Sequence, residues 1–212
     1  MALDIWLTFF TACWVISFSP GAGAVASMSS GLQYGFRHGY WNVIGLQLAL
    51  VVQIGVVVAG VGAVLATSAW AFEFIKWFGV GYLVYLGWLQ WHATPANLDD
   101  EVEHARDTRR ESPARLVLKG FLVNMSNPKA IVFILAVLPQ FLNTEAALPL
   151  QYGVMLITMV AVDLVVMAIY TGLAAKVLRY LQSPRQQRLL NRSFAVMFVG
   201  AASLLSTVHR AS

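Results

Sequence analysis

The stretch ARLVLKGFLVNMSNPKAIVFILAVL, residues 114–138, is apolar over most of its length and is interrupted in its middle by Asn127-Pro128-Lys129. Its length suits a helix that crosses a bilayer, since a span needs about 20 largely apolar residues. A proline removes a backbone donor and disfavours helix at the residue before it. We therefore expect a membrane helix that is broken near the midplane, with Asn127 satisfying backbone groups that the break frees.

The composition of the whole chain agrees with a membrane protein. Of the 212 residues, 58% are hydrophobic and 11% are charged, whereas soluble domains carry about 25% charged residues. This excludes the soluble, disordered, collagenous and coiled-coil classes. The single cysteine excludes an internal disulfide framework and a cysteine-based metal cluster. The net charge of +4 fits basic loops at a membrane better than contact with nucleic acid, so no nucleic-acid partner is expected.

Hydropathy along the chain predicts an all-α polytopic membrane protein with six transmembrane helices. The polar segment 93–113, rich in acids and arginines, separates the third helix from the fourth and is expected to be a solvated loop. The predicted spans are 3–28, 40–66, 71–91, 114–138, 150–174 and 193–208.

Lysines and arginines indicate the orientation of these helices. They concentrate in 93–119 and in the connector 176–192, with Arg37 between the first two spans. Because cytoplasmic loops are enriched in basic residues, we expect these segments to face the cytoplasm and both termini to face the periplasm.

The two halves of the chain carry similar short motifs. Phe18-Ser19-Pro20-Gly21-Ala22 corresponds to the segment 125–130, and Tyr34-Gly35 corresponds to Tyr152-Gly153. An odd number of helices per copy inverts the second copy, and inverted repeats with broken helices are a transporter architecture. We expect a first three-helix repeat over 1–92 and a second over 114–212, with broken first and fourth helices.

The first break is predicted at Pro20, which is followed by Gly21, Ala22 and Gly23. A broken helix presents a half-helix N-terminus, which attracts carboxylates. The alternative is a plain proline kink between packed helices, which membranes tolerate. Two breaks in corresponding places favour the binding site.

Two charges lie deep within the spans, Lys129 after the second break and Asp163 in the middle of the fifth span. Each is costly against lipid, so each should face the protein interior or the other charge. A zwitterionic amino acid needs an anion for its ammonium group and donors for its carboxylate. Asp163 could supply the first and also carry the coupling proton, while Lys129 and the half-helix ends could supply the second. The alternative is a structural Asp163–Lys129 pair.

Other polar residues at span depth are weaker candidates for a pathway. Asn124 precedes the second break and joins the predicted substrate-binding set. The remaining ones are expected to form helix–helix hydrogen bonds. They are Gln47, Gln53, Tyr170 and Thr171. The histidines are too scattered for a metal site, and no metal or other cofactor is expected.

The motifs resemble the LysE-type amino-acid exporter superfamily, and most closely its homoserine and homoserine-lactone exporter branch. The resemblance covers nearly the whole chain, and its most specific part is Asn124-x-x-Asn127-Pro128-Lys129-Ala130 leading to Leu138-Pro139-Gln140-Phe141. Such exporters carry a second proline where this chain has Ala22. The resemblance implies a bacterial inner-membrane protein that expels small amino acids or their derivatives, driven by the proton gradient. Its partners would be the amino acid, protons and the lipid bilayer.

Several alternatives stay open at this point. The residues do not choose among homoserine, its lactone, threonine, and leucine-like, cysteine or basic amino acids, and they leave the oligomeric state open, a homodimer included. An intramembrane enzyme is disfavoured because the common catalytic motifs are missing and one membrane Asp cannot form an aspartyl dyad. A passive channel should show charge rings or a carbonyl filter.

Overall fold

The computed structural model describes the chain apart from residues 20, 68, 94–110, 144–145, 175–182 and 207–212. Every regular element in the described part is a helix, which confirms the all-α prediction. In chain order they are α1 (Leu3–Phe18), α2 (Ala22–Thr67), α3 (Ala69–His92), α5 (Pro113–Met125), α6 (Pro128–Val137), the 3-10 helix η1 (Leu138–Phe141), α7 (Leu148–Gly172) and α9 (Pro184–Ser206).

Two of these helices, α2 and α7, are long and apolar enough to cross a membrane on their own. A third span results if α5 and the segment from α6 through η1 are taken together as one helix bent by 58°. Helix α1 is apolar but has only 16 residues. The predicted count of six spans and the inverted relation of the two halves therefore stay predictions.

Helix α2 departs most from the prediction. Its 46 residues would measure about 69 Å as one straight helix, more than twice the hydrocarbon thickness. Gly35 divides it, since its φ of 72° and ψ of 169° are not helical, a conformation that glycine adopts without steric cost. The predicted gap between spans one and two, 29–39, is therefore wrong. Residues 29–39 are helical apart from Gly35, because the residues on both sides of Gly35 are compatible with helix.

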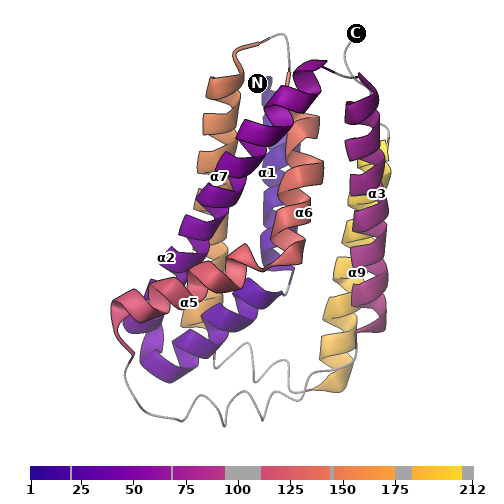
Figure 1. The fold of residues 1–212 in the computed structure, drawn as a ribbon. Coiled ribbons are helices and arrows are strands. Elements are labelled where there is room, and N and C mark those ends of the chain that lie inside the picture. The colour runs from indigo at the N-terminus through magenta and orange to yellow at the C-terminus, as the bar shows by residue number, and fades with distance from the viewer. Residues whose placement is uncertain (20, 68, 94–110, 144–145, 175–182, 207–212) are drawn as a thin grey trace.

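Helix α2 forms the centre of the arrangement and packs against α5 and α7 (Figure 1). Helix α5 can approach α2 closely because glycines face it. A Cβ at Gly45 would clash with the carbonyl oxygen of Val117, and a Cβ at Gly120 would clash with that of Asn42. Helix α5 thus runs across the lower end of the bundle in Figure 1 before the chain turns upward into α6.

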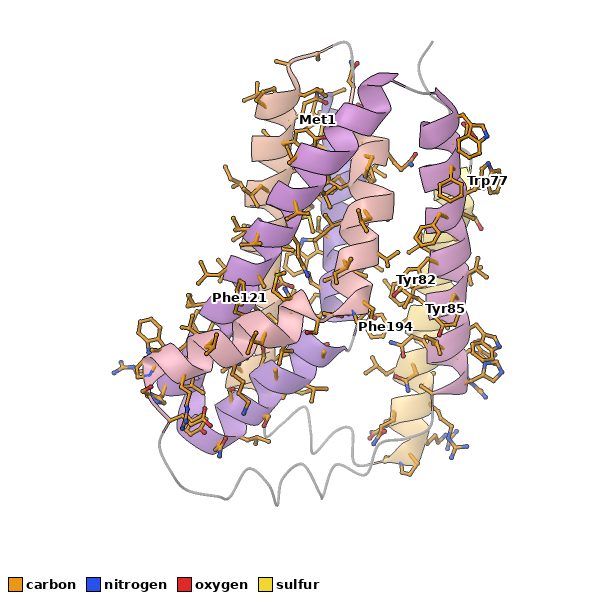
Figure 2. The ribbon with its side chains drawn as sticks, in the orientation of Figure 1. Met1, Trp77, Tyr82, Tyr85, Phe121 and Phe194 are labelled. Carbon is orange, nitrogen blue, oxygen red and sulfur yellow. The ribbon has the colours of Figure 1, made fainter. Side chains whose placement is uncertain are left out.

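Helices α3 and α9 form a second packed pair beside α6 (Figure 1). The outer face of α3 carries large aromatic side chains. Trp77 is 56% exposed and Tyr85 is 49% exposed, and Trp77 points away from the bundle in Figure 2. The interior is filled by aliphatic and aromatic residues such as Phe9, Leu46 and Ile134, each at most 1% exposed. An apolar exterior over an apolar core is what a lipid environment requires.

The predicted start of the last helix needs a correction. Helix α9 begins at Pro184, well before the predicted start at 193. Ser183 accepts backbone hydrogen bonds from Gln186 and Gln187 at the helix start, and proline suits the first helical position. The rest of the connector, 176–182, and most of the loop 93–113 lie outside the described residues. The described end of that loop leads into α5, whose N-cap is Ser112.

Candidate functional site

The second helix break is stabilised by residues next to it. Helix α5 ends at Met125 and α6 begins at Pro128, the position where a missing N–H costs nothing. The Asn127 side chain accepts a hydrogen bond from the backbone N–H of Lys129 at 3.1 Å, so Asn127 is the N-cap of α6. This confirms the predicted break and the predicted part of Asn127 in it.

Asn124 joins this break to α2. Its side-chain amide donates to the carbonyl oxygen of Leu46 at 2.9 Å, and its side-chain oxygen accepts from Asn127 at 3.2 Å. Gln53 donates to the Asn124 backbone carbonyl at 2.8 Å. Of these bonds, the one from Gln53 goes to a backbone carbonyl at the end of α5, where the last carbonyl groups lack helical partners. Asn124 and Asn127 therefore hold the broken helix in place while they also line the cavity described below.

The first break is stabilised from the other half of the chain. The Lys129 ammonium group donates to the carbonyl oxygens of Ile16 at 3.2 Å and Ser19 at 2.5 Å. The Tyr170 hydroxyl donates to the Phe18 carbonyl at 2.6 Å. The C-terminal carbonyls of a helix lack internal partners and carry partial negative charge, so a cation there is favourable. Lys129 thus belongs to α6 but caps α1.

The glycines of the first break lie beside this lysine. A Cβ at Gly21 would be 3.0 Å from the Lys129 ammonium nitrogen, so the space next to Gly21 is occupied by the lysine tip. Gly23, in the first turn of α2, lines the cavity. Pro20 lies outside the described residues. Pro128 begins α6, is exposed and is not among the residues that line the cavity. It therefore shapes the site by starting the helix and does not line the cavity.

Asp163 is held by a polar side chain from another helix. Gln47 of α2 donates from Nε2 to its Oδ2 at 2.6 Å, and Ser17 of α1 lines the same cavity. Hydrogen bonds to a charged group are stronger than those between neutral groups. The carboxylate, half-buried in the bundle, is therefore fixed in direction.

The alternative of a structural Asp163–Lys129 pair is not what the structure contains. Among the described residues, no ion pair within 4.0 Å joins the two side chains, and the Lys129 ammonium is directed at the end of α1. The two charges do line the same cavity. They are therefore separate polar groups of one site, each with its own hydrogen bonds.

The cavity lies where the two breaks meet, and its volume is about 60 Å³. The ends of the broken helices and the charged side chains of Lys129 and Asp163 all line this cavity. Its lining comes from α1 with Ser19 (Cys13, Ile16, Ser17, Ser19), from α2 (Gly23, Ala24, Leu46, Leu50), from the second break and α6 (Asn124, Asn127, Lys129, Ala130, Phe133, Ile134) and from α7 (Met159, Asp163, Met167). Within the described residues no three His, Cys, Asp or Glu side chains come together as metal ligands.

Five of the lining residues belong to the predicted site: Gly23, Asn124, Asn127, Lys129 and Asp163. Ser17 was missed, because a serine in an apolar helix carries no distinctive signal. Gln47 was predicted to form a helix–helix hydrogen bond, which is confirmed, but its partner is the site carboxylate. The partner of Tyr170, at the end of α1, was also not foreseen.

The chain is similar to several bacterial proteins over nearly its whole length. It is 42% identical to an uncharacterized membrane protein of Vibrio cholerae, over 98% of both chains. It is 33% identical to the homoserine/homoserine lactone efflux protein of Salmonella typhimurium, over 100% of both chains. It is 25% identical to the leucine efflux protein of Klebsiella pneumoniae, over 96% of this chain and 95% of that one. No solved structure gives a significant match.

The family comparison covers both helix breaks and the cavity between them. Residues 14–208 match the family described as LysE type translocator. This range includes every lining residue of the cavity except Cys13, and it extends through α9. The resemblance drawn from the sequence motifs is thereby confirmed, and the chain belongs to the LysE type translocator family.

Proposed function

We propose that the protein exports small neutral amino acids or their derivatives across the bacterial inner membrane, in exchange for protons and by alternating access. The observation that carries this proposal is the single cavity that Asp163, Lys129 and both helix breaks share. Such a site, formed by discontinuous helices, is a recurrent arrangement in secondary transporters.

In this proposal the ammonium group of the substrate binds to Asp163. It is the one acidic side chain among the lining residues. Homoserine and its lactone share the amino group, whereas the lactone has no free carboxylate. A site that accepts both would therefore depend most strongly on its anion, and the directed carboxylate of Asp163 meets that need.

The substrate carboxylate, where present, binds near the first turn of α2 and Lys129. Gly23 and Ala24 line the cavity at a half-helix N-terminus, where backbone N–H groups favour an anion. An ammonium group has three donors, and two of those on Lys129 are engaged with Ile16 and Ser19. The third remains for a carboxylate oxygen.

The rest of the lining favours a neutral substrate side chain. It consists mainly of aliphatic, aromatic and sulfur-containing residues, including Leu46, Phe133 and Met159. A basic amino acid would bring a second cation into this site, where no second acid among the lining residues could pair with it. Burying an unpaired charge is strongly unfavourable.

Proton exchange follows from having one acidic group for two cationic ligands. A proton and a substrate ammonium would compete for the same carboxylate, so release of one would accompany binding of the other. The cavity of about 60 Å³ has room for water molecules that could carry the proton. In alternating access, helix movements would open it to one side at a time.

Homoserine and its lactone are the first candidate substrates, because the Salmonella typhimurium relative that is 33% identical is named for their efflux. Threonine, an isomer of homoserine, belongs to the same group. A leucine-like substrate is the second candidate, supported by relatives named leucine efflux proteins, such as the one from Klebsiella pneumoniae. The apolar lining is compatible with both.

The orientation we propose puts both termini in the periplasm, with 93–113 and 176–192 in the cytoplasm, because basic residues concentrate in and beside these segments. A cysteine introduced into either loop should escape a membrane-impermeant thiol reagent applied to intact cells. Cys13 is buried, which keeps the background labelling low. Strong labelling of either loop would overturn the orientation.

The proposed function is tested with purified protein in liposomes. Homoserine, its lactone, threonine, leucine and lysine are compared, with and without an imposed pH gradient. We expect gradient-driven uptake and counterflow for the small neutral substrates, and both should be lost in Asp163→Asn, which keeps the size but not the charge. Asp4→Asn, a change of an exposed acid, is the control. Uptake without counterflow would indicate a channel, and near-normal activity of Asp163→Asn would overturn the proposal.

A further inference from the structure

Gln47 donates a hydrogen bond to Asp163, but the oxygen of its side-chain amide has no hydrogen-bond partner. Its side chain is 6% exposed, and its Nε2 donates to Asp163 Oδ2 at 2.6 Å. Its Oε1 is buried and has no hydrogen-bond partner. A buried acceptor without a donor is unfavourable and calls for an explanation.

The hydrogen-bonding needs of Asp163 change when it takes up a proton. The ionised carboxylate only accepts hydrogen bonds, whereas the protonated group also has an O–H to donate. The Nε2 of Gln47 suits the ionised form, while its idle Oε1 is the acceptor that the protonated form needs. The titratable side chains that interact electrostatically with Asp163 are Cys13 of α1, Tyr40 of α2 and Lys129 of α6.

We infer that Gln47 is a positioning residue that keeps Asp163 hydrogen-bonded in both protonation states, by donating from Nε2 to the carboxylate and, after half a turn of its amide, accepting at Oε1 from the protonated acid. This inference rests on the proposed role of Asp163 in proton exchange. The two ends of the amide are similar in size, so the turn needs little extra space. The Oε1 of Gln47, which has no partner in this structure, is then the acceptor for the protonated state of Asp163.

Gln53 provides a matched control on the same helix. It is also 6% exposed, its Nε2 also makes one buried bond, and its Oε1 also lacks a partner. Its acceptor, however, is the backbone carbonyl of Asn124, which does not titrate. Replacing either glutamine by methionine keeps the length of the side chain and removes the amide.

The experiment compares Gln47→Met, Gln53→Met and the wild type in liposomes, with gradient-driven transport measured from pH 5 to pH 9. If Gln47 serves both states, Gln47→Met should lower the maximal rate about tenfold and also move the pH midpoint about 0.5–1 unit upward. The shift arises because a hydrogen bond to a charged group exceeds one between neutral groups by about 1 kcal/mol, or roughly 0.7 pH unit. Gln53→Met should lower the rate without a shift.

Other outcomes would overturn the inference. An unmoved midpoint in Gln47→Met, or an equal shift in Gln53→Met, would reduce Gln47 to a packing residue. A shift of about two units at full maximal rate would mean that Gln47 serves only the ionised form. Should Gln47→Met not fold, Gln47→Asn, whose amide is one methylene too short, takes its place. Asp163→Asn is run in parallel, because transport that persists there defeats the proposed function itself, whatever Gln47 does.

Discussion

The two helix breaks differ in where their hydrogen bonds come from. At the second break, Asn127 caps the helix that it begins, and Asn124 lies three residues away. At the first break, the end of α1 is capped by Lys129 and Tyr170, which are more than a hundred residues away in sequence. The second break is therefore self-contained in its cap, although Asn124 and Gln53 also join it to α2, whereas the cap of the first break depends on the second half of the chain.

This difference suggests which break moves during transport. A cap formed by neighbouring residues persists when helices shift, because its members shift together. A cap formed across helices is lost when α6 or α7 moves relative to α1. If the protein transports as proposed, we therefore expect the end of α1 to be the place where opening of the cavity is coupled to binding at Lys129, with the α5–α6 break as the fixed part.

The largest expected effect comes from Lys129→Met, which removes the cap of the first break and leaves the second intact. The carbonyls of Ile16 and Ser19 would lose their donor, and we expect the free energy of unfolding to fall by about 2–4 kcal/mol. Transport should fall about a hundredfold, the factor that roughly 3 kcal/mol corresponds to. Thermal unfolding in detergent and liposome uptake measure the two effects.

The control for this change is Lys119→Met on α5, where the lysine is exposed and should tolerate replacement. The variant Lys129→Met/Asp163→Asn adds a second check. Because no ion pair joins the two residues, removing both charges should not restore transport. Recovery in the double variant would mean that they form a pair after all and that the α1 cap is incidental.

A smaller effect is expected from Asn127→Ala at the self-contained break. Loss of the α6 cap should cost about 1–2 kcal/mol of stability, and Asn124 would also lose its donor. Transport should fall about tenfold, because Pro128 still prevents a continuous helix. Ser112→Ala removes the exposed N-cap of α5 and should leave transport unchanged. A loss as severe as that of Lys129→Met would contradict the contrast between the breaks.

The sequence predicts the break that is capped by neighbouring residues better than the break that is capped by distant ones. The second break and its cap were predictable because Asn127, Pro128 and Lys129 are adjacent, and local rules for proline and N-caps apply there. The residues that cap the end of α1 were not predictable, since nothing in a single sequence pairs Tyr170 with Phe18. The charged residues of the site were found because an intramembrane charge is rare, whereas Ser17 is an ordinary residue in an apolar helix.

The helix bounds show a second limit. Hydropathy marks the apolar part of a helix and not its ends. It therefore predicts a start of α9 at 193, after the observed start at Pro184, and a loop around Gly35 where the chain is helical. The signals were present: Ser183-Pro184 is a helix start, and Gly35 is a residue that tolerates positive φ. Neither signal changes the mean hydropathy, on which the span assignment was based.

Gly21→Ala should disturb the first break mildly. Its new Cβ would lie 3.0 Å from the lysine nitrogen and 3.1 Å from Lys129 Cε, so the flexible tip must move away from the α1 carbonyls. We expect transport to fall about threefold, the factor for roughly 0.7 kcal/mol. Gly55→Ala, at a helical site with nothing within 4 Å of the new Cβ, should be neutral or slightly stabilising. Equal transport in both variants would show that the lysine position is not critical.

The smallest effect, and the sharpest test of the contrast, is Tyr170→Phe, which deletes one hydroxyl at the end of α1. A matched hydroxyl is that of Tyr40, which donates to the Leu164 carbonyl at 3.3 Å. Leu164 lies inside α7, where its carbonyl already has a helical partner, whereas the Phe18 carbonyl is at a helix end and does not. Tyr170→Phe should therefore lower the free energy of unfolding by about 0.5 kcal/mol and slow transport about twofold, and Tyr40→Phe should do less on both counts. Equal losses would mean that helix ends in this protein need no partner from the other half, and the first break would then be as self-contained as the second.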